Sequence, residues 1–280
     1  MTLLLPNRDI DLTDLGGLKF KESDHSYHNA EGIKYTGVTT LLSKYKSQKF
    51  DGEKTARYKA MKDYLPENIF NKLKEMAGGW ENVHEYYERT CNKGEEYMIN
   101  LERIKNEYIE SWENKAVSGS EEHDSRERDI IENGFYYKNK LYPYLNKNIL
   151  EITKDDFGVC TEILLWNHDL KLAGLADVVL FNKGKFYILD FKTNKEIKTT
   201  GFMGRKLLAP FDNLPDCEFS VYSLQLNIYA HMISDLSGCR YIDAHLISTQ
   251  SDEYNRPKDI YIECLDLRNE VKTEIFNELF

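Results

Sequence analysis

Two short apolar segments, each carrying an aspartate, constrain the fold of this chain more than any other feature. Residues 174–180 surround Asp177, and residues 187–193 contain Asp190 and Lys192. Short runs of valine, leucine, isoleucine and aromatic residues are typical of buried β-strands. Side chains alternate along a strand, so Asp190 and Lys192 are expected on one face. The two segments therefore predict neighbouring strands that present two carboxylates and one ammonium group at the same place.

This set of charges is suited to cutting a phosphodiester bond. At neutral pH that reaction needs a hard cation held by oxygen ligands, an activated water molecule and positive charge near the transition state. Glu162, inside the apolar segment 160–165, adds a third carboxylate. A D-x-K triplet alone is common, and strand-ending aspartates beside a surface lysine would also explain it. Burying an idle carboxylate is costly, however, so the apolar surroundings of Glu162 and Asp177 favour the metal site.

Four elements then follow one another along the chain. They are Glu162, the step Gly174-x-x-Asp177, the segment Asp190-Phe191-Lys192-Thr193, and residues 222–229 with Gln225 and Tyr229 four positions apart. In this order they resemble the motifs of the PD-(D/E)XK nuclease superfamily, and the Q-x-x-x-Y spacing resembles its RecB-type exonuclease branch. Gly119-x-x-x-His123 is similar to a helical element of that family whose histidine is a further metal ligand. Residues 25–42 look like the hairpin that opens many phage-encoded and mitochondrial exonucleases of this branch.

The resemblance implies a role for each of these residues. Mg²⁺ or Mn²⁺, as one or two ions, would be held by Asp177, Asp190, His123 and the backbone carbonyl of Phe191, with Glu162 completing the shell or holding a second ion. Lys192 would position the attacking water and stabilise negative charge. Gln225 and Tyr229, which share a helical face, would orient Lys192 or a DNA phosphate. The implied activity is that of a DNA exonuclease acting in replication, recombination or repair.

DNA contacts are expected in two places. The scissile strand would pass the residues that follow the second strand: Thr193, Asn194 and Lys195. A basic segment with interleaved aromatic residues, containing Lys46, Lys49 and Arg57, would bind a single strand or the frayed end of a duplex. A solvated surface would also explain such a basic run. Replication or recombination proteins are the further partners that this reading implies.

The order of the other segments predicts an α/β or α+β fold with a mixed sheet flanked by helices. A hairpin is expected over residues 18–39 and helices over 53–115, followed by a new helix that begins at a capping box at Ser118. The later strands are expected at 149–152, 159–166, 172–181, 185–191, 241–248 and 260–263, with helices at 219–236 and from Leu267. We expect an N-terminal region of residues 1–117 and a nuclease core of residues 118–280.

Composition narrows the function classes. The net charge of −10 argues against a protein that coats nucleic acid by bulk electrostatics. The five cysteines are scattered without C-x-x-C spacing, so neither a zinc ribbon nor an iron–sulfur cluster is expected. No G-x-x-x-x-G-K-[ST] loop is present, which argues against nucleotide binding. Neither a signal peptide nor a membrane anchor is expected, so the protein is predicted to be cytoplasmic, and its lysine- and asparagine-rich usage suits a phage protein in a bacterial host.

Other functions stay open at this point. A structure-specific or sequence-specific endonuclease would keep the same fold and residues. A catalytically idle DNA-binding subunit would keep the fold, although it has no reason to retain the complete set of Glu162, Asp177, Asp190 and Lys192. A metal-binding regulator that does not bind nucleic acid is the remaining alternative.

Overall fold

The chain forms two compact units in the computed structural model. The model describes residues 9–47, 51–79, 82–90, 95–194, 196–251 and 257–277. The first unit consists of Met1–Ser47 and Glu122–Phe280, and the second of Gln48–Glu121. Within the described part of the chain, none of the helices combines the length and apolar character that a bilayer span requires.

Strands dominate the first unit and helices make up the second. The strands are β1 Ile10–Asp11, β2 Lys19–Lys21, β3 Ser26–His28, β4 Lys34–Gly37, β5 Phe135–Tyr137, β6 Lys140–Tyr142, β7 Phe157–Asn167, β8 Leu172–Asn182, β9 Lys185–Lys192, β10 Arg240–Ser251 and β11 Pro257–Glu263. The helices are α1 Val38–Ser43, α2 Gly52–Tyr64, α3 Glu67–Met76, α4 Val83–Thr90, α5 Glu95–Asn133, α6 Glu218–Ser237 and α7 Arg268–Glu274.

A large mixed sheet forms the frame of the first unit, which confirms the predicted α/β architecture. Among the described residues its strand order is β1-β2-β3-β4-β8-β9-β10-β11. β4 and β9 pair with different parts of one edge of β8, and β7 pairs with the opposite edge. The pairs β7–β8, β8–β9 and β10–β11 are antiparallel, whereas β4–β8 and β9–β10 are parallel. The parallel step from β9 to β10 is made possible by the crossover helix α6.

One edge of β8 is shared by two strands, and the site lies between them. β4 pairs with Leu172 and Ala173, whereas β9 pairs with residues 178–181. In the described ladder, residues 174–177 have no partner on that edge, although β7 pairs along the opposite one. β9 therefore leaves β8 at Asp177 and opens a fork in the sheet.

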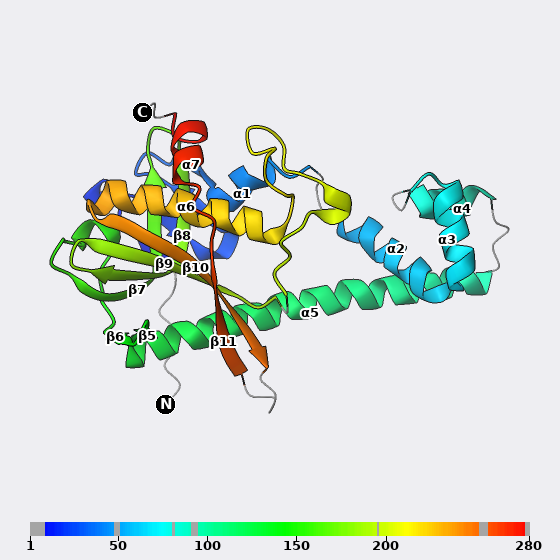
Figure 1. Cartoon of the computed structure of the whole chain (residues 1–280), viewed down its shortest axis with the longest axis horizontal. Helices are drawn as coiled ribbons and strands as arrows, with labels where there is room; N and C mark the ends of the chain where they lie inside the picture. Colours follow the sequence, from blue (N-terminus) through cyan, green and yellow to red (C-terminus); the bar gives the residue numbers. More distant parts are fainter. Residues whose placement is uncertain are drawn as a thin grey trace. The chain divides into compact units, whose positions relative to one another are not determined.

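Apolar side chains cover both faces of this sheet. On one face α6 packs on β7, β8, β9 and β10, as Figure 1 shows, around a core that includes Val179, Phe186 and Leu224. On the other face the last turns of α5 and the β5–β6 hairpin contribute Ile130 and Tyr137 to a second core. Burial of both faces explains why β8 and β9 read as nearly continuous apolar runs.

The second unit is a small helical cluster. α2, α3, α4 and the first part of α5 enclose a core that contains Met61, Phe70, Val83 and Leu101. The buried ammonium group of Lys105 is paired with Glu53 Oε1 at 2.8 Å and with Glu102. The helical pattern expected for this segment is confirmed, although Trp80 and Gly94, which contributed to that expectation, lie outside the described residues.

Three local predictions were wrong. No helix begins at Ser118, because α5 runs without interruption from Glu95 to Asn133. Residues 149–152 do not form a strand: Asn148 and Glu151 make a capping box that holds Ile149–Glu151 in a 3₁₀ turn. A second turn, Glu22–Asp24, divides the first expected strand into β2 and β3. The capping-box pattern at Ser118 thus lies within a continuous helix, and at the other two places a local turn interrupts the apolar pattern.

The core on the α6 side predicts a stability effect. Phe186 in β9 is fully buried and packs on Phe181 and Tyr241. The Phe186→Ala substitution should lower the free energy of unfolding by about 4 kcal/mol, because it removes buried surface and leaves a cavity. Urea denaturation measures this change. Lys185→Ala, an exposed neighbour on the same strand, is the control, and a loss below about 1 kcal/mol for Phe186→Ala would contradict this packing.

Candidate metal centre

Three carboxylates lie in one row across three neighbouring strands. Thr161 pairs with Val178 and Ile163 with Ala176, so Glu162 stands opposite Asp177. Val178 and Leu189 are the last pair of β8 and β9, and Asp190, the next residue of β9, lies near enough to Asp177 for its charge to raise the pKa of that carboxyl. Like charges directly opposite one another destabilise a sheet. A row of this kind is stable when a cation or a basic group compensates its charge.

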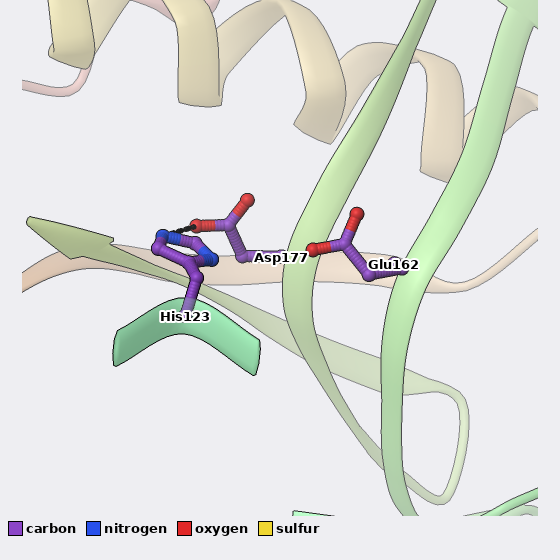
Figure 2. Close-up of side chains that lie close together, drawn as sticks. All are labelled: His123, Glu162 and Asp177. Carbon is purple, nitrogen blue, oxygen red and sulfur yellow. Dashed lines mark ion pairs between the residues drawn. The ribbon is translucent and has the colours of Figure 1, made fainter. Parts of the chain in front are cut away.

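A histidine from α5 joins this row. His123 Nε2 lies 3.3 Å from Asp177 Oδ2, and ligand atoms of His123, Glu162 and Asp177 all fall within 4.8 Å of one another. Figure 2 shows the three side chains converging from α5, β7 and β8. One imidazole nitrogen and two carboxylates form a donor set that suits a divalent cation. The structure therefore contains an acidic and histidine cluster that fits a metal ion.

The fork in the sheet determines how Phe191 enters this cluster. Where β9 leaves β8, the backbone N–H of Phe191 donates a hydrogen bond to Asp177 Oδ2 at 3.1 Å. The carbonyl oxygen of the same residue lies 3.2 Å from His123 Nε2. The Asp177 side chain thus replaces a missing backbone partner, and the Phe191 carbonyl is brought to the metal-ligand cluster.

Lys192 lies beside the carboxylate row. Its Nζ is 2.5 Å from Asp190 Oδ2 and 4.3 Å from the centre of the Tyr222 ring. Asp190 is 2% exposed, and apart from this ion pair its Oδ2 has no hydrogen-bond partner. Burial alone lowers the pKa of Lys192, but the negative charges of Asp190 and Asp177 outweigh it and raise the pKa above its usual value. Lys192 is therefore a fixed positive charge.

The carboxyl group of Asp177 is perturbed in the opposite sense. Burial, and then the neighbouring charge of Asp190, raises its pKa to about 6, although His123 and Lys192 offset part of the effect. Both causes act because the metal-free cluster concentrates negative charge in a poorly solvated place. A bound cation would remove this penalty.

Glu162 occupies an unusual backbone conformation. Its φ of 48° lies in the left-handed region, although it sits in the middle of β7. Such a conformation is uncommon for a residue with a side chain and costs about 1–3 kcal/mol. Glu162 also lines a cavity of about 240 Å³ together with Glu127, Tyr144 and Thr161. Strained residues of this kind cluster at functional sites.

Gln225 and Tyr229 lie on the face of α6 that covers the sheet. Gln225 Nε2 donates a hydrogen bond to the Tyr229 hydroxyl at 3.2 Å, and Tyr229 is buried against Gly174. A Cβ atom at Gly174 would come within 2.5 Å of the Tyr229 ring, which explains why glycine is required there. The described contact from α6 to Lys192 is made by Tyr222, one turn earlier.

The expected DNA-binding residues are placed as follows. Thr193 is exposed and Asn194 is partly buried directly after β9, whereas Lys195 and Lys49 lie outside the described residues. Lys46 is exposed in the first unit; Arg57 belongs to α2 of the second unit and pairs with Glu53 at 3.0 Å.

Arg126 contacts the site, and its role was not anticipated from the sequence. Its guanidinium group makes two hydrogen bonds to Asp259 in β11, at 2.7 and 3.0 Å, and lies 4.6 Å from the centre of the Phe191 ring. It also contacts Glu122 and Thr249. The available signal was its position three residues after His123, which places both on one face of α5. Arg126 therefore joins α5 to β11 and lies against the Phe191 ring without belonging to the ligand cluster.

Comparisons with known proteins show little similarity. No protein-family model matches the sequence, and no curated protein matches it significantly. The crystal structure of SSO0001 aligns over 87% of this chain and 76% of its own, with 14% identity and a TM-score of 0.31. A structure named "Putative exonuclease" from Eubacterium rectale aligns over 82% and 83%, with 10% identity and a TM-score of 0.28.

The raised pKa of Asp177 predicts how metal binding depends on pH. The folded protein keeps the Asp177 proton that the unfolded chain loses near pH 3.8, so this group lowers the stability of the metal-free protein as the pH rises through about 6. The increase in melting temperature caused by Mn²⁺ should therefore grow between about pH 5 and pH 7.5. Differential scanning fluorimetry measures it. Asp177→Asn should abolish most of the Mn²⁺ effect, and an effect that stayed constant with pH in the native protein would refute this assignment.

The contacts of Arg126 predict an indirect effect on metal affinity. Arg126→Met keeps most of the side-chain volume but removes the hydrogen bonds to Asp259, so His123 and Phe191 should be less firmly positioned. We expect Mn²⁺ to bind about tenfold more weakly, as measured by isothermal titration calorimetry. Arg128→Met on the same helix is the matched control, because Arg128 bonds to the Asp124 carbonyl. Equal affinities for the native protein and Arg126→Met would exclude a positioning role.

Proposed function

We propose that this protein is a metal-dependent deoxyribonuclease, and more narrowly a DNA exonuclease of the RecB-type branch of the PD-(D/E)XK superfamily. The observation that carries the proposal is the group of Glu162, Asp177 and Asp190 on three neighbouring strands, with His123 beside Asp177 and Lys192 paired with Asp190. Opposed carboxylates that share one buried place are costly without a cation. The combination of this acidic cluster with a fixed positive charge matches the requirements of phosphodiester hydrolysis.

The residues of the cluster are proposed as ligands of a divalent cation. His123, Asp177, Asp190 and the Phe191 carbonyl are the candidate ligands for Mg²⁺ or Mn²⁺, and Glu162 could complete the shell or hold a second ion. A divalent cation at this place supplies Lewis-acid polarisation of the phosphate and lowers the pKa of a coordinated water. Mg²⁺ and Mn²⁺ both accept these oxygen-rich ligands.

Lys192 contributes charge and position. The ion pair with Asp190 and the ring of Tyr222 restrict its ammonium group from two sides. An ammonium group held in this way can donate hydrogen bonds to the attacking water and to a phosphate oxygen as negative charge develops. Gln225 and Tyr229 lie on the same face of α6 as Tyr222. We assign them the role of orienting Tyr222, which contacts Lys192.

The substrate is proposed to be DNA with an accessible end. Thr193 and Asn194 directly follow the strand that carries Asp190 and Lys192, so a scissile strand at the cluster would pass them. Lys195, Lys46, Lys49 and Arg57 are proposed as further phosphate contacts. An endonuclease of the same fold would use the same cluster. The form of DNA that is degraded, linear or circular, distinguishes an endonuclease from an exonuclease.

The test is hydrolysis of end-labelled single-stranded and double-stranded DNA in the presence of Mg²⁺ or Mn²⁺. Asp190→Asn and Lys192→Met should each reduce the rate by at least about 100-fold, because each removes charge needed at the transition state. Chelation of the metal should abolish cleavage. Lys185→Met, an exposed lysine at the opposite end of β9, is the matched control and should cleave normally.

Linear and closed circular DNA are compared in the same assay. Degradation of linear DNA alone is expected for an exonuclease, whereas cleavage of circles would identify an endonuclease. Full activity of both Asp190→Asn and Lys192→Met would refute the assignment of this cluster as the nuclease centre.

A further inference from the structure

The loop between β9 and α6 exposes large apolar side chains. Phe202 is 59% exposed, Met203 is 77% exposed and Leu208 is 49% exposed. Single exposed apolar residues are ordinary on protein surfaces, but three within seven positions of one loop are a concentration that marks interaction sites. The loop is drawn in yellow in Figure 1, before α6. We refer to Phe202 and Met203 together as the tip.

The tip is held by a rigid frame. Gly204 N–H donates to the Gly201 carbonyl at 3.0 Å, and Arg205 N–H donates to the Phe202 carbonyl at 3.1 Å. A Cβ atom at Gly201 would come within 2.0 Å of the Arg205 carbonyl, so the turn is as tight as a glycine allows. The exposed side chains are therefore presented by an ordered turn.

Below the tip, the loop is anchored to the body of the first unit. Leu207 and Phe211 are buried, and the Phe211 ring packs edge-on against Tyr45 at 5.0 Å between ring centres. Leu208 N–H donates to the Tyr45 carbonyl at 2.7 Å, and Ser47 Oγ donates to Asp216 at 2.5 Å. These contacts keep the tip from folding back onto the sheet.

Met203 adopts a conformation that costs free energy. Its φ of 55° and ψ of 30° are left-handed, and Gly204 follows with a φ of 75°. A residue with a side chain is sterically disfavoured in this region, whereas glycine adopts it freely. Backbone strain of this kind is found mainly where a side chain serves a function.

The charge around the tip is suited to a polyanion. Residues 193–217, which join β9 to α6, contain four basic and three acidic residues, a net charge of +1 in a chain of net charge −10, and both residues that follow Gly204, Arg205 and Lys206, are basic. The Arg205 guanidinium lies 5.8 Å from the centre of the Phe202 ring. Two apolar side chains, Phe202 and Met203, and two cationic ones, Arg205 and Lys206, thus lie within five residues. Sites of this composition bind the bases and phosphates of a single strand.

The base of the loop connects to the candidate metal centre. Phe219 N–H donates to the Lys198 carbonyl at 3.1 Å, and Lys198 N–H donates to Glu218 Oε2 at 3.1 Å. One turn further along α6, Tyr222 contacts Lys192. Met203 is five positions after Lys198, so the tip lies within about 18 Å of the loop base, a span of a few nucleotides.

We propose that the tip is a nucleobase-stacking site for a single DNA strand, a few nucleotides from the scissile bond. The proposal rests on the proposed nuclease function. The Phe202 ring and the Met203 thioether contact the faces of bases, while Arg205 and Lys206 contact the adjoining phosphates. Stacking of this kind holds a strand without reading its sequence. It would keep an unpaired end beside the metal centre.

The test removes the tip without weakening the fold. In the Phe202→Ala/Met203→Gly variant, glycine relieves the left-handed strain, so the melting temperature should be unchanged or higher. The matched control is Tyr136→Ala/Leu141→Ala, which removes a cross-strand pair that is 64% and 53% exposed on the β5–β6 hairpin. Binding is measured in EDTA, which prevents cleavage, with single-stranded oligonucleotides that carry 2-aminopurine at successive positions.

The native protein should quench 2-aminopurine at one or two positions near the bound end. The tip variant should lose this quenching and bind about tenfold more weakly, the loss expected when a base–aromatic stack is removed, whereas the control pair should behave like the native protein. With Mg²⁺, the control pair should hydrolyse the oligonucleotide at the native rate.

Each other outcome has a separate meaning. Equal quenching and affinity for the native protein and the tip variant would overturn the stacking site and leave the nuclease assignment intact. Failure of the native protein to cleave any DNA would overturn the proposed function, while the binding assay would still report on stacking. If the tip variant lost binding only to phosphatidylcholine–phosphatidylserine vesicles, the surface would belong to a lipid partner and the DNA proposal would be wrong.

Discussion

The hydrogen bond from the Phe191 backbone to Asp177 is the interaction on which the site depends. β9 pairs with β8 up to Val178 and then leaves it, so one backbone N–H would otherwise lose its partner at a buried place. The Asp177 carboxylate satisfies it, and the same departure brings the Phe191 carbonyl to His123. The end of β8–β9 pairing thus produces the ligand cluster. If the pairing had continued, the backbone N–H and carbonyl of Phe191 would have been used within the sheet.

Two basic side chains lie against the carboxylates of the cluster. Lys192 pairs with Asp190 within the same strand, and His123 approaches Asp177 from α5. The cost that remains appears in the raised pKa of Asp177 and in the left-handed conformation of Glu162. Such residual costs are expected where a fold keeps groups for binding rather than for stability. A bound cation would compensate the negative charge that raises the pKa of Asp177.

The supporting contacts lie on both faces of the sheet. On one face α6 brings Tyr222 to Lys192 and fills the space above Gly174 with the Tyr229 ring. On the other, Arg126 joins the last turns of α5 to β11 and to the Phe191 ring. The same α6 begins at the base of the loop that presents Phe202 and Met203. One helix therefore links the candidate metal centre to the proposed DNA-stacking surface.

The sequence by itself determined the long strands and α6, because their apolar runs have the length and periodicity of buried elements. It also singled out Glu162 and Asp177 as carboxylates in apolar runs where idle charges are costly, Asp190 and Lys192 by their spacing on one strand face, and His123 by a family resemblance. Only the tertiary structure decided that these groups face one another, since that depends on strand register and on the departure of β9 from β8. The continuity of α5 and the contacts of Arg126 and Tyr222 were likewise decided by packing between segments far apart in the chain, which no local pattern encodes.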